Sequence, residues 1–395
     1  MNHNLKFLIL LLGVAIVSWI ITRIAIILAL KNDVVDHPRE SRFHENVTPL
    51  LGGISFNLTF ILGCIYFFPL HTVVLLFSSI TGIFLVIRKK KVSLLLSSLI
   101  YMGLYTYLVL KFPAGKMNSS WLYLLGGGQI IFLTGLWDDG IRELDAKRKL
   151  LFQFVAALYF ILPGQTVTFF PFPVNYMVTT FWIVSLTNAF NLIDGMNGLA
   201  SGVAFLSAVF FGLISHYTGQ TQLSWFCFIF GGAIAGYIPF NFPKARIFMG
   251  DSGSMFLGFI LGSIAIFGTW RTNLPAISLS VPLMVLMYPL FDVALVMFNR
   301  IRERRSPFQG GNDHSHHRLV KMGLSPFDAV LFIYLVAFYN GFSAYFITMI
   351  SYRSGLKMLF FTMAVMTLLG LRLSFVNGEL KRQTKEFETV PTDRE

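Results

Sequence analysis

The sequence predicts an all-α polytopic membrane protein, and three observations carry this prediction. Of its 395 residues, 55% are hydrophobic and only 13% are charged, whereas about a quarter of a typical soluble domain is charged. Long apolar runs recur along the chain, as expected for helices that cross a bilayer. The formal net charge is +12. In a membrane protein, this charge favours basic cytoplasmic loops and anionic partners over nucleic-acid binding.

Thirteen apolar runs are candidate spans, and we predict about 11–13 transmembrane helices. The first run is too long for a removable signal peptide and lacks a small-residue cleavage site, so we interpret it as a retained span. The segment 71–110 is either a hairpin of ordinary spans or partly re-entrant. We expect one membrane domain over 1–376 and a polar cytoplasmic tail over 377–395. The runs lie at 6–30, 50–69, 71–87, 92–110, 119–137, 149–163, 176–189, 198–216, 222–239, 254–270, 277–298, 326–350 and 355–376.

Charged residues orient these spans. With the N-terminus outside, most of the 31 Lys and Arg residues fall in cytoplasmic segments, which is the positive-inside pattern. All 19 acidic residues also lie in or next to these segments, although that rule does not govern acids. An acid-rich face made of several separate loops suits a charged, metal-bound substrate. The cytoplasmic segments are 31–48, 88–91, 138–149, 188–198, 240–253, 299–325 and the residues after 376.

The stretch from Asn188 to Gly198 separates two apolar runs and contains Asn188, Asn191, Asp194 and Asn197. Asn and Asp are poor in helix interiors but are good turn formers and good ligands for hard cations. A capped turn would explain this stretch if it stood alone. The other polar loops favour a functional site.

Adjacent carboxylates, Asp138 and Asp139, end the fifth apolar run, and a basic segment ending at Lys149 follows. Two neighbouring carboxylates stay charged most easily beside a cation or a metal. A carboxylate here could hold Mg²⁺ or accept a proton from an acceptor hydroxyl. A solvated helix end is an equally good interpretation of this loop by itself.

The segment Gly250-Asp-Ser-Gly-Ser254 leads directly into another apolar run. Ser252 or Ser254 can cap that helix, whose free N–H groups favour an anion. Asp251 at the same place suits a hard cation that bridges to phosphate. The cap and the site are compatible here.

Two further loops carry groups that suit phosphate. Arg42 and His44 could cluster on phosphate oxygens, although positive-inside anchoring explains that loop equally simply. Three of the chain's eight histidines fall within 314–317, next to Arg318. Zinc is disfavoured because both cysteines, Cys64 and Cys227, lie in apolar runs. Imidazoles beside an arginine suit a diphosphate better.

Taken together, these loops resemble the polyprenyl-phosphate N-acetylhexosamine-1-phosphate transferases over most of residues 33–320. The matching pieces occur in the family's order and on one predicted membrane face. They are Asp36-His-Pro with Arg42, His44, Pro49 and Gly52-Gly53; Asp138-Asp139 with Lys149; Asn188-Ala-Phe-Asn191-Leu-Ile-Asp194-Gly; 241–254; Pro289 with Asp292; and 306–319.

The resemblance implies that undecaprenyl phosphate attacks the sugar-attached phosphate of a UDP-HexNAc, most simply UDP-GlcNAc, and releases UMP. The product would initiate a cell-surface polysaccharide at the bacterial inner membrane, with the active site facing the cytoplasm. Mg²⁺ is the implied cofactor, with Mn²⁺ as an alternative. No nucleic-acid partner is implied, and a homodimer is left open.

Site roles follow from the resemblance by position. Asp251, with Asn191 and Asn188, is expected to hold the metal. Asp138, Asp139, Asp194 and Lys149 are expected to be catalytic, with nucleophile and base roles open. Phosphate contacts are expected from Arg42, His44, His314, His316, His317 and Arg318, and sugar or nucleotide contacts from Asn197 and Asn241.

The sequence departs from the family pattern in two places. Asn197 stands where the family often has Asp, and the gap from Gly53 to Asp138 is longer by about one helical hairpin, which we assign to 71–110. Thr-Pro-Leu-Leu-Gly-Gly and His-Ser-His-His favour a GlcNAc-type enzyme over the muramyl-pentapeptide enzyme.

Two other functions are alternatives to this one. A transporter or flippase of an anionic lipid-linked substrate should carry ionisable groups near mid-span, where the sequence places only Arg23 and Arg372. A membrane scaffold would explain the basic loops but not the Asn/Asp and His clusters.

Overall fold

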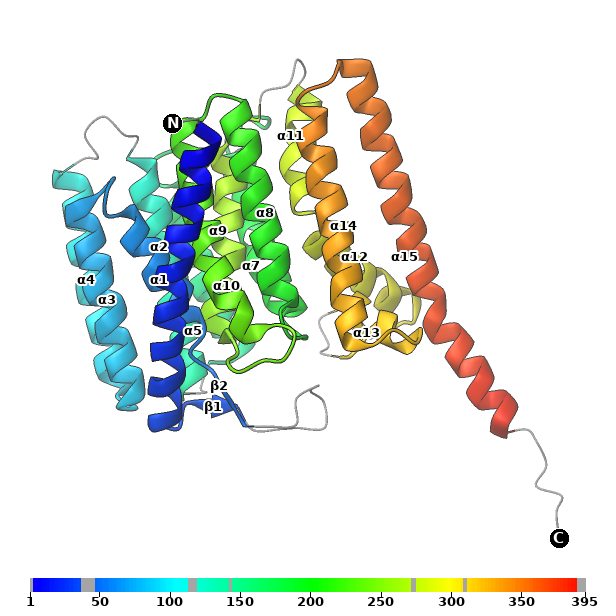
Figure 1. Cartoon of the computed structure of the whole chain (residues 1–395), viewed down its shortest axis with the longest axis horizontal. Coiled ribbons are helices and arrows are strands. Elements are labelled where there is room, and N and C mark those ends of the chain that lie inside the picture. The colour runs from blue at the N-terminus through cyan, green and yellow to red at the C-terminus, as the bar shows by residue number, and fades with distance from the viewer. Residues whose placement is uncertain are drawn as a thin grey trace, which may run out of the picture.

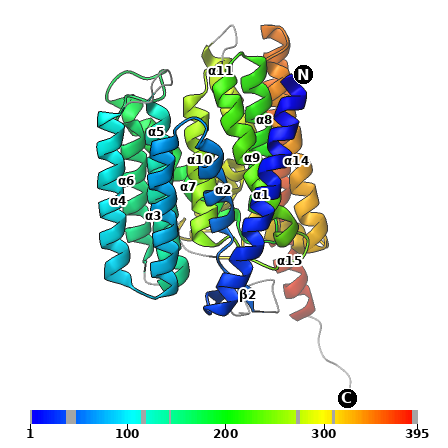
Figure 2. The same cartoon turned by 60° about the vertical axis from the view of Figure 1, so that its left-hand side comes forward.

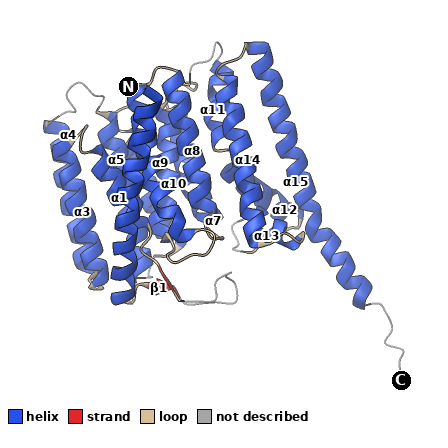
Figure 3. Cartoon of the chain, in the orientation of Figure 1, coloured by secondary structure: helices blue, strands red, loops and turns tan. Residues whose placement is uncertain are grey.

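The computed structural model describes residues 3–36, 47–112, 119–141, 144–270, 275–307 and 311–388. Long helices stand side by side in one bundle, and the described strands form a single short ribbon (Figures 1 and 3). In this ribbon, β1 (Val35–Asp36) pairs antiparallel with β2 (Thr48–Pro49), with Val35 opposite Pro49. The predicted all-α polytopic class is confirmed.

Each predicted apolar run contains a helix, because an apolar segment satisfies its backbone polar groups internally in this form. The predicted run 277–298 contains two helices. The helices are α1 (His3–Lys31), α2 (Gly53–Cys64), α3 (Pro69–Ile87), α4 (Lys91–Lys111), α5 (Ser120–Ile141), α6 (Ala146–Ile161), α7 (Val174–Ile193), α8 (Leu199–Tyr217), α9 (Thr221–Asn241), α10 (Gly250–Phe267), α11 (Pro275–Val285), α12 (Met287–Arg302), α13 (Ser315–Lys321), α14 (Pro326–Ile347) and α15 (Tyr352–Glu388).

The number of full-length spans is smaller than the predicted 11–13. In the described part of the chain, nine helices are long and apolar enough to cross a membrane, or ten if the pair α11–α12 counts as one. Helices α2 and α6 have only 12 and 16 residues. A bend of 77° separates the helical segments Leu279–Val285 and Met287–Arg302.

Helix α10 lies at the centre of the bundle and packs against α5 and α7, with α2 and α8 on further sides. The backbones of α5 and α10 approach closely at Gly135, where a Cβ atom would collide with the backbone of Asp251 and Ser252. Glycine at this position therefore lets α5 bring its carboxyl end directly against the first turn of α10.

Helices α3 and α4 form a hairpin on the outer side of α5 (Figure 2). Buried polar contacts attach it, since the Ser79 hydroxyl donates to Asn57 Oδ1 at 3.0 Å and accepts from Gln129 Nε2 at 3.1 Å. The Tyr105 hydroxyl donates to the Leu122 carbonyl at 2.7 Å. This hairpin occupies the segment to which we assign the surplus length.

The polar connections that carry the sequence motifs gather at one end of the bundle, where the ribbon and α13 lie (Figure 1). Helix α15 continues past the predicted boundary at 376 as far as Glu388. The first part of the predicted polar tail is therefore helical, and 389–395 lies outside the described residues.

Candidate active site

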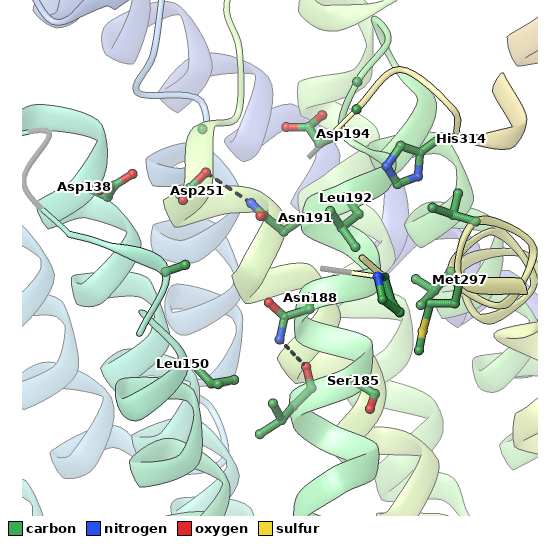
Figure 4. A pocket seen from close by; sticks show the side chains of 18 of the residues that line it. Asp138, Leu150, Ser185, Asn188, Asn191, Leu192, Asp194, Asp251, Met297 and His314 are labelled. Atoms are coloured by element: carbon green, nitrogen blue, oxygen red, sulfur yellow. Dashed lines mark hydrogen bonds between the residues drawn. The ribbon is translucent and has the colours of Figure 1, made fainter. Parts of the chain in front are cut away.

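A cavity of about 1460 Å³ opens at this end of the bundle. Its wall has a polar part and an apolar part. The polar part joins the carboxyl ends of α5 and α7 to the first turn of α10 and to α13, and Figure 4 shows several of its residues. The apolar part runs along α6, α7 and α12 through Leu150, Phe154, Leu158, Ile161, Met177, Phe181, Val184, Val293, Val296 and Met297.

Asp251 lies in the first turn of α10 and meets side chains from two other helices. Lys149 Nζ lies 2.5 Å from Asp251 Oδ2 and 2.7 Å from Asp138 Oδ2. Asn191 Nδ2 donates to Asp251 Oδ1 at 3.1 Å and to Ser254 Oγ at 2.9 Å. Four residues that the sequence predicted for one site, Asp138, Lys149, Asn191 and Asp251, therefore form one cluster.

Asp139 faces a different way from its neighbour Asp138. Its two carboxylate oxygens accept hydrogen bonds from the backbone N–H groups of Asp251 and Ser252 at 2.7 and 3.0 Å, and from Ser252 Oγ at 2.6 Å. These N–H groups lie in the first turn of α10 and have no acceptor within their own helix. Asp139 thus caps α10 from a neighbouring helix and fixes the turn that presents Asp251.

Gly250 makes this cap geometrically accessible. It adopts φ +68°, and a Cβ atom there would come within 2.6 Å of the Asp139 carboxyl carbon. A positive φ and this close approach both favour glycine. The Gly-Asp-Ser-Gly-Ser segment is therefore both a helix start and the support for Asp251.

Asn188 lies one turn before Asn191 on α7 and pairs with Gln153 of α6. Asn188 Nδ2 donates to Gln153 Oε1 at 2.5 Å, and Gln153 Nε2 donates to Asn188 Oδ1 at 3.3 Å. Gln153 is buried and was not predicted from the sequence. Its spacing of four residues from Lys149 on the same helix was the available signal.

The loop after α7 brings Asp194 and Asn197 to the cavity wall, and Asn241 reaches the same wall from the end of α9. Asp194 follows the last residue of α7 and lines the same cavity as His314 (Figure 4). Asn241 is buried, accepts from the Gly198 N–H at 2.8 Å and donates to the Ile247 carbonyl at 2.9 Å. Asn197 is partly exposed and reaches the Pro243 carbonyl at 3.4 Å. Asn241 thus connects two loops, and Asn197 is the more accessible amide.

His314, His316 and His317 all line the cavity from the start of α13. The rings of His314 and His316 are stacked with centroids 5.6 Å apart, and those of His316 and His317 are 4.4 Å apart. His314 Nδ1 lies 2.7 Å from Asp292 Oδ2. The predicted histidine motif is therefore a single group of rings on the polar wall.

Burial keeps two of these rings neutral. Desolvation lowers the pKa of His316 to about 3, although the nearby Asp292 opposes this shift. Desolvation, with repulsion from His314, lowers the pKa of His317 to about 4. His316 is only 1% exposed, and neither of its ring nitrogens has a hydrogen-bond partner among the described residues. A buried polar ring without a partner favours a ligand at this wall.

The sequence predicts that Arg318 contacts phosphate, but its side chain lies away from the cavity. Its side chain is fully buried, and it donates to the backbone carbonyls of Asp313 and Leu373 at 2.7 and 3.1 Å. It is not among the described residues that line the cavity. Arg300, which sequence reasoning missed, does line it and pairs with Asp313 at 2.6 Å. The predicted phosphate contacts Arg42 and His44 lie outside the described residues.

The donor set around Asp251 fits a hard divalent cation. Within the described residues, no group of three or more His, Cys, Asp and Glu side chains has the geometry of a complete metal cage. Mg²⁺ usually takes only one or two protein carboxylates and completes its shell with phosphate and water oxygens. Asp138 and Asp251 supply two such carboxylates, and the Asn191 amide oxygen is a third oxygen donor nearby.

Comparison with known proteins identifies similar sequences. A family model described as glycosyl transferase family 4 matches residues 121–269. The chain is 27% identical over 394 residues to a probable undecaprenyl-phosphate N-acetylglucosaminyl 1-phosphate transferase of Bacillus subtilis (strain 168), which covers 97% of this chain and 96% of that protein.

Two further relatives have similar names. The undecaprenyl-phosphate alpha-N-acetylglucosaminyl 1-phosphate transferase of Salmonella typhi is 28% identical over 324 residues, covering 78% of this chain and 75% of that one. The decaprenyl-phosphate N-acetylglucosaminephosphotransferase of Mycolicibacterium smegmatis is 27% identical over 360 residues, covering 82% and 78%. Residues 121–269 therefore match glycosyl transferase family 4, and the chain over most of its length is similar to polyprenyl-phosphate N-acetylglucosamine-1-phosphate transferases.

Proposed function

We propose that this protein transfers N-acetylglucosamine-1-phosphate from UDP-GlcNAc to undecaprenyl phosphate and releases UMP. The relatives' names support this reaction. The observation that carries the proposal is one cavity that joins the carboxylate, lysine and amide cluster at Asp251 to a long apolar wall. The match to glycosyl transferase family 4 and the similarity to these transferases disfavour a transporter or flippase.

In the proposed reaction, a phosphate oxygen of the lipid forms a bond to the sugar-attached phosphorus. The bond from that phosphorus to the UMP oxygen breaks, and UMP leaves with its electron pair. One phosphoanhydride replaces another, so the protein has little covalent work to do. Its contribution is to position two anions and to offset their repulsion.

Asp251 and Asp138 would hold Mg²⁺, or Mn²⁺ in its place, with help from Asn191. When bound, this cation would neutralise charge on the joined phosphates. Asn188 would act through its pair with Gln153, which holds it one turn from Asn191. Asp139 would act indirectly, since its carboxylate is occupied by the first turn of α10.

Lys149 and Asp138 would handle the acceptor phosphate. Lys149 can offer an ammonium to a phosphate oxygen, and Asp138 can orient the acceptor or accept its proton. His314, His316, His317 and Asp194 would surround the diphosphate of the sugar nucleotide. Asn197 would contact the sugar or the nucleotide, while Asn241 would keep the loops around it in place.

The apolar wall suits an isoprenoid chain. Leu150, Phe154 and Leu158 are spaced by four residues along one face of α6, and Met177 and Phe181 face the same cavity from α7. Burial of an apolar chain contributes roughly 25 cal/mol per Å². The acceptor's tail would therefore bind along this wall while its phosphate reaches the polar part.

The reaction would take place at the cytoplasmic face of the bacterial inner membrane, where sugar nucleotides are available. The positive-inside distribution of Lys and Arg supports this orientation. A homodimer is compatible with the proposal.

A transfer assay tests the proposal. Membranes that contain the protein are incubated with radiolabelled UDP-GlcNAc, undecaprenyl phosphate and Mg²⁺, and the butanol-extractable product and UMP are measured. UDP-GalNAc, UDP-QuiNAc and UDP-FucNAc serve as competing donors. We expect GlcNAc transfer that stops when EDTA removes the metal. Absence of product from every donor would contradict the proposal.

A further inference from the structure

Asp292 is a fully buried carboxylate on α12, with 0% of its surface exposed. One oxygen lies 2.7 Å from His314 Nδ1. The other accepts from the backbone N–H and the hydroxyl of Ser315 at 2.7 and 2.6 Å. A buried carboxylate is costly to leave unpaired, and this one uses both oxygens at the start of α13.

This contact determines which nitrogen of His314 carries a proton. An ionised carboxylate can only accept hydrogen bonds, so His314 Nδ1 must donate. Nε2 is then the nitrogen that remains for a ligand. His314 lines the cavity, as Asp194 does (Figure 4).

Neighbouring contacts hold this arrangement in place. The Tyr288 hydroxyl lies 2.9 Å from Ser315 Oγ, so the hydroxyl next to Asp292 is itself held. Arg300 pairs with Asp313 through two nitrogens at 2.9 and 2.6 Å, which attaches α12 to the residue before His314. The His314 ring is therefore fixed by its backbone on both sides and by a carboxylate behind it.

We propose that Asp292 is a positioning residue that holds His314 in its Nδ1–H form, with Nε2 presented to the substrate phosphates. When a phosphate oxygen shares or delivers a proton at Nε2, the carboxylate stabilises the resulting imidazolium. This inference rests on the proposed phosphoryl transfer. It adds to that transfer a buried residue whose effect is exerted through His314.

The test is Asp292→Asn, which keeps the shape of the side chain but has one oxygen and one NH₂ group. The amide oxygen is expected to face Ser315, so the NH₂ group faces His314 Nδ1 and forces this nitrogen to accept. The ring then carries its proton at Nε2 and cannot become an imidazolium. We expect kcat to fall on the order of 100-fold or more, with the KM for UDP-GlcNAc changed by less than about threefold.

Ser315→Ala is the matched control, because it removes one hydrogen bond to the same carboxylate and leaves the His314 contact in place. It should retain kcat within about threefold. Equal losses in Asp292→Asn and Ser315→Ala would show that Asp292 only anchors α13, and would overturn the proposal. An unchanged kcat in Asp292→Asn would overturn it as well.

A spectroscopic measurement gives an independent readout that does not need activity. The protein is labelled with ¹⁵N-histidine, and the His314 signal is assigned by its loss in His314→Gln. We expect a proton on Nδ1 in the wild-type protein, and an Nε2–H tautomer at neutral pH would overturn the proposal. If wild-type membranes form no lipid-linked sugar, the proposed function fails, while this spectrum still decides the role of Asp292.

Discussion

Lys149 Nζ lies 2.5 Å from Asp251 Oδ2, and the same ammonium lies 2.7 Å from Asp138 Oδ2. One cation from α6 thus neutralises two carboxylates that come from α5 and α10. The metal that we propose for this site would use the same carboxylates. Lys149 and the metal therefore share their ligands, and binding of the metal requires this lysine to give up at least part of its contacts.

Replacing Lys149 by Met should separate metal binding from catalysis. Without the ammonium, the Asp138 and Asp251 carboxylates repel each other and attract a divalent cation more strongly. We expect Mn²⁺ to bind the substrate-free variant roughly tenfold more tightly than it binds the wild-type protein, as measured by electron paramagnetic resonance. Transfer activity should fall on the order of 100-fold or more.

Lys147→Met is the control for this experiment, because Lys147 is exposed and lies two residues away, on the opposite side of the same helix. It removes the same charge without touching the carboxylates, and it should leave Mn²⁺ affinity and transfer within about twofold. Unchanged or weaker Mn²⁺ binding in Lys149→Met would contradict the idea that lysine and metal share ligands.

Asp138 and Asp139 should respond differently to replacement by Asn. Asp138→Asn should reduce transfer on the order of 100-fold or more with little change in thermal unfolding. Asp139→Asn removes one acceptor from the cap of α10, so it should lower stability by about 1–2 kcal/mol as well as activity. Thermal unfolding in detergent and the transfer assay measure the two effects. Equal stability losses in the two variants would refute the assignment of Asp139 as the cap.

Gly250→Ala tests the close approach of α10 to Asp139. A Cβ atom there meets the carboxylate and the backbone has φ +68°, so we expect a loss of stability above about 1 kcal/mol. Gly164→Ala is a matched control, since Gly164 has φ +84° with nothing within 4 Å of the added atom. The difference between the two variants isolates the contact with Asp139. Comparable losses would mean that backbone strain alone accounts for the effect.

The buried rings of His316 and His317 should make the stability of the fold sensitive to mild acid. The pKa values of about 3 for His316 and about 4 for His317 lie below the ordinary value of 6.5. Between those values and 6.5, the unfolded chain binds more protons than the folded one, so stability falls as the pH drops through this window. The midpoint temperature of thermal unfolding should therefore fall between pH 7 and pH 5. His317→Gln should flatten that decline, and an identical decline in this variant would argue against the role of His317.

The sequence was sufficient for the fold class and for the convergence of Asp138, Lys149, Asn191 and Asp251. Apolar runs and charge placement determine which ends of the helices share a face, and motifs at those ends can then meet. Asp138 and Asp139 could not be told apart in this way. Successive residues of a helix point about 100° apart, so one carboxylate reaches Lys149 while the other reaches α10.

Other features depend on tertiary packing and have only weak sequence signals. Arg318 is next to the histidines in sequence, but its guanidinium donates to the Asp313 and Leu373 carbonyls. Asp292 belongs to one of the matching motifs, but the sequence assigns it no role. Its partner His314 is 22 residues away, so their contact appears only in the fold. The contact of Gln153 with Asn188 could be predicted only from the packing of α6 against α7.

The 77° bend between α11 and α12 has a consequence for how the two substrates could arrive. It turns α12 away from the direction of α11, and Val293 and Met297 of the turned helix face the cavity together with α6 and α7. If the proposed transfer is correct, the isoprenoid can slide in sideways from the membrane while the nucleotide enters from water. The isoprenoid acceptor would then remain in the lipid bilayer while it receives its sugar phosphate.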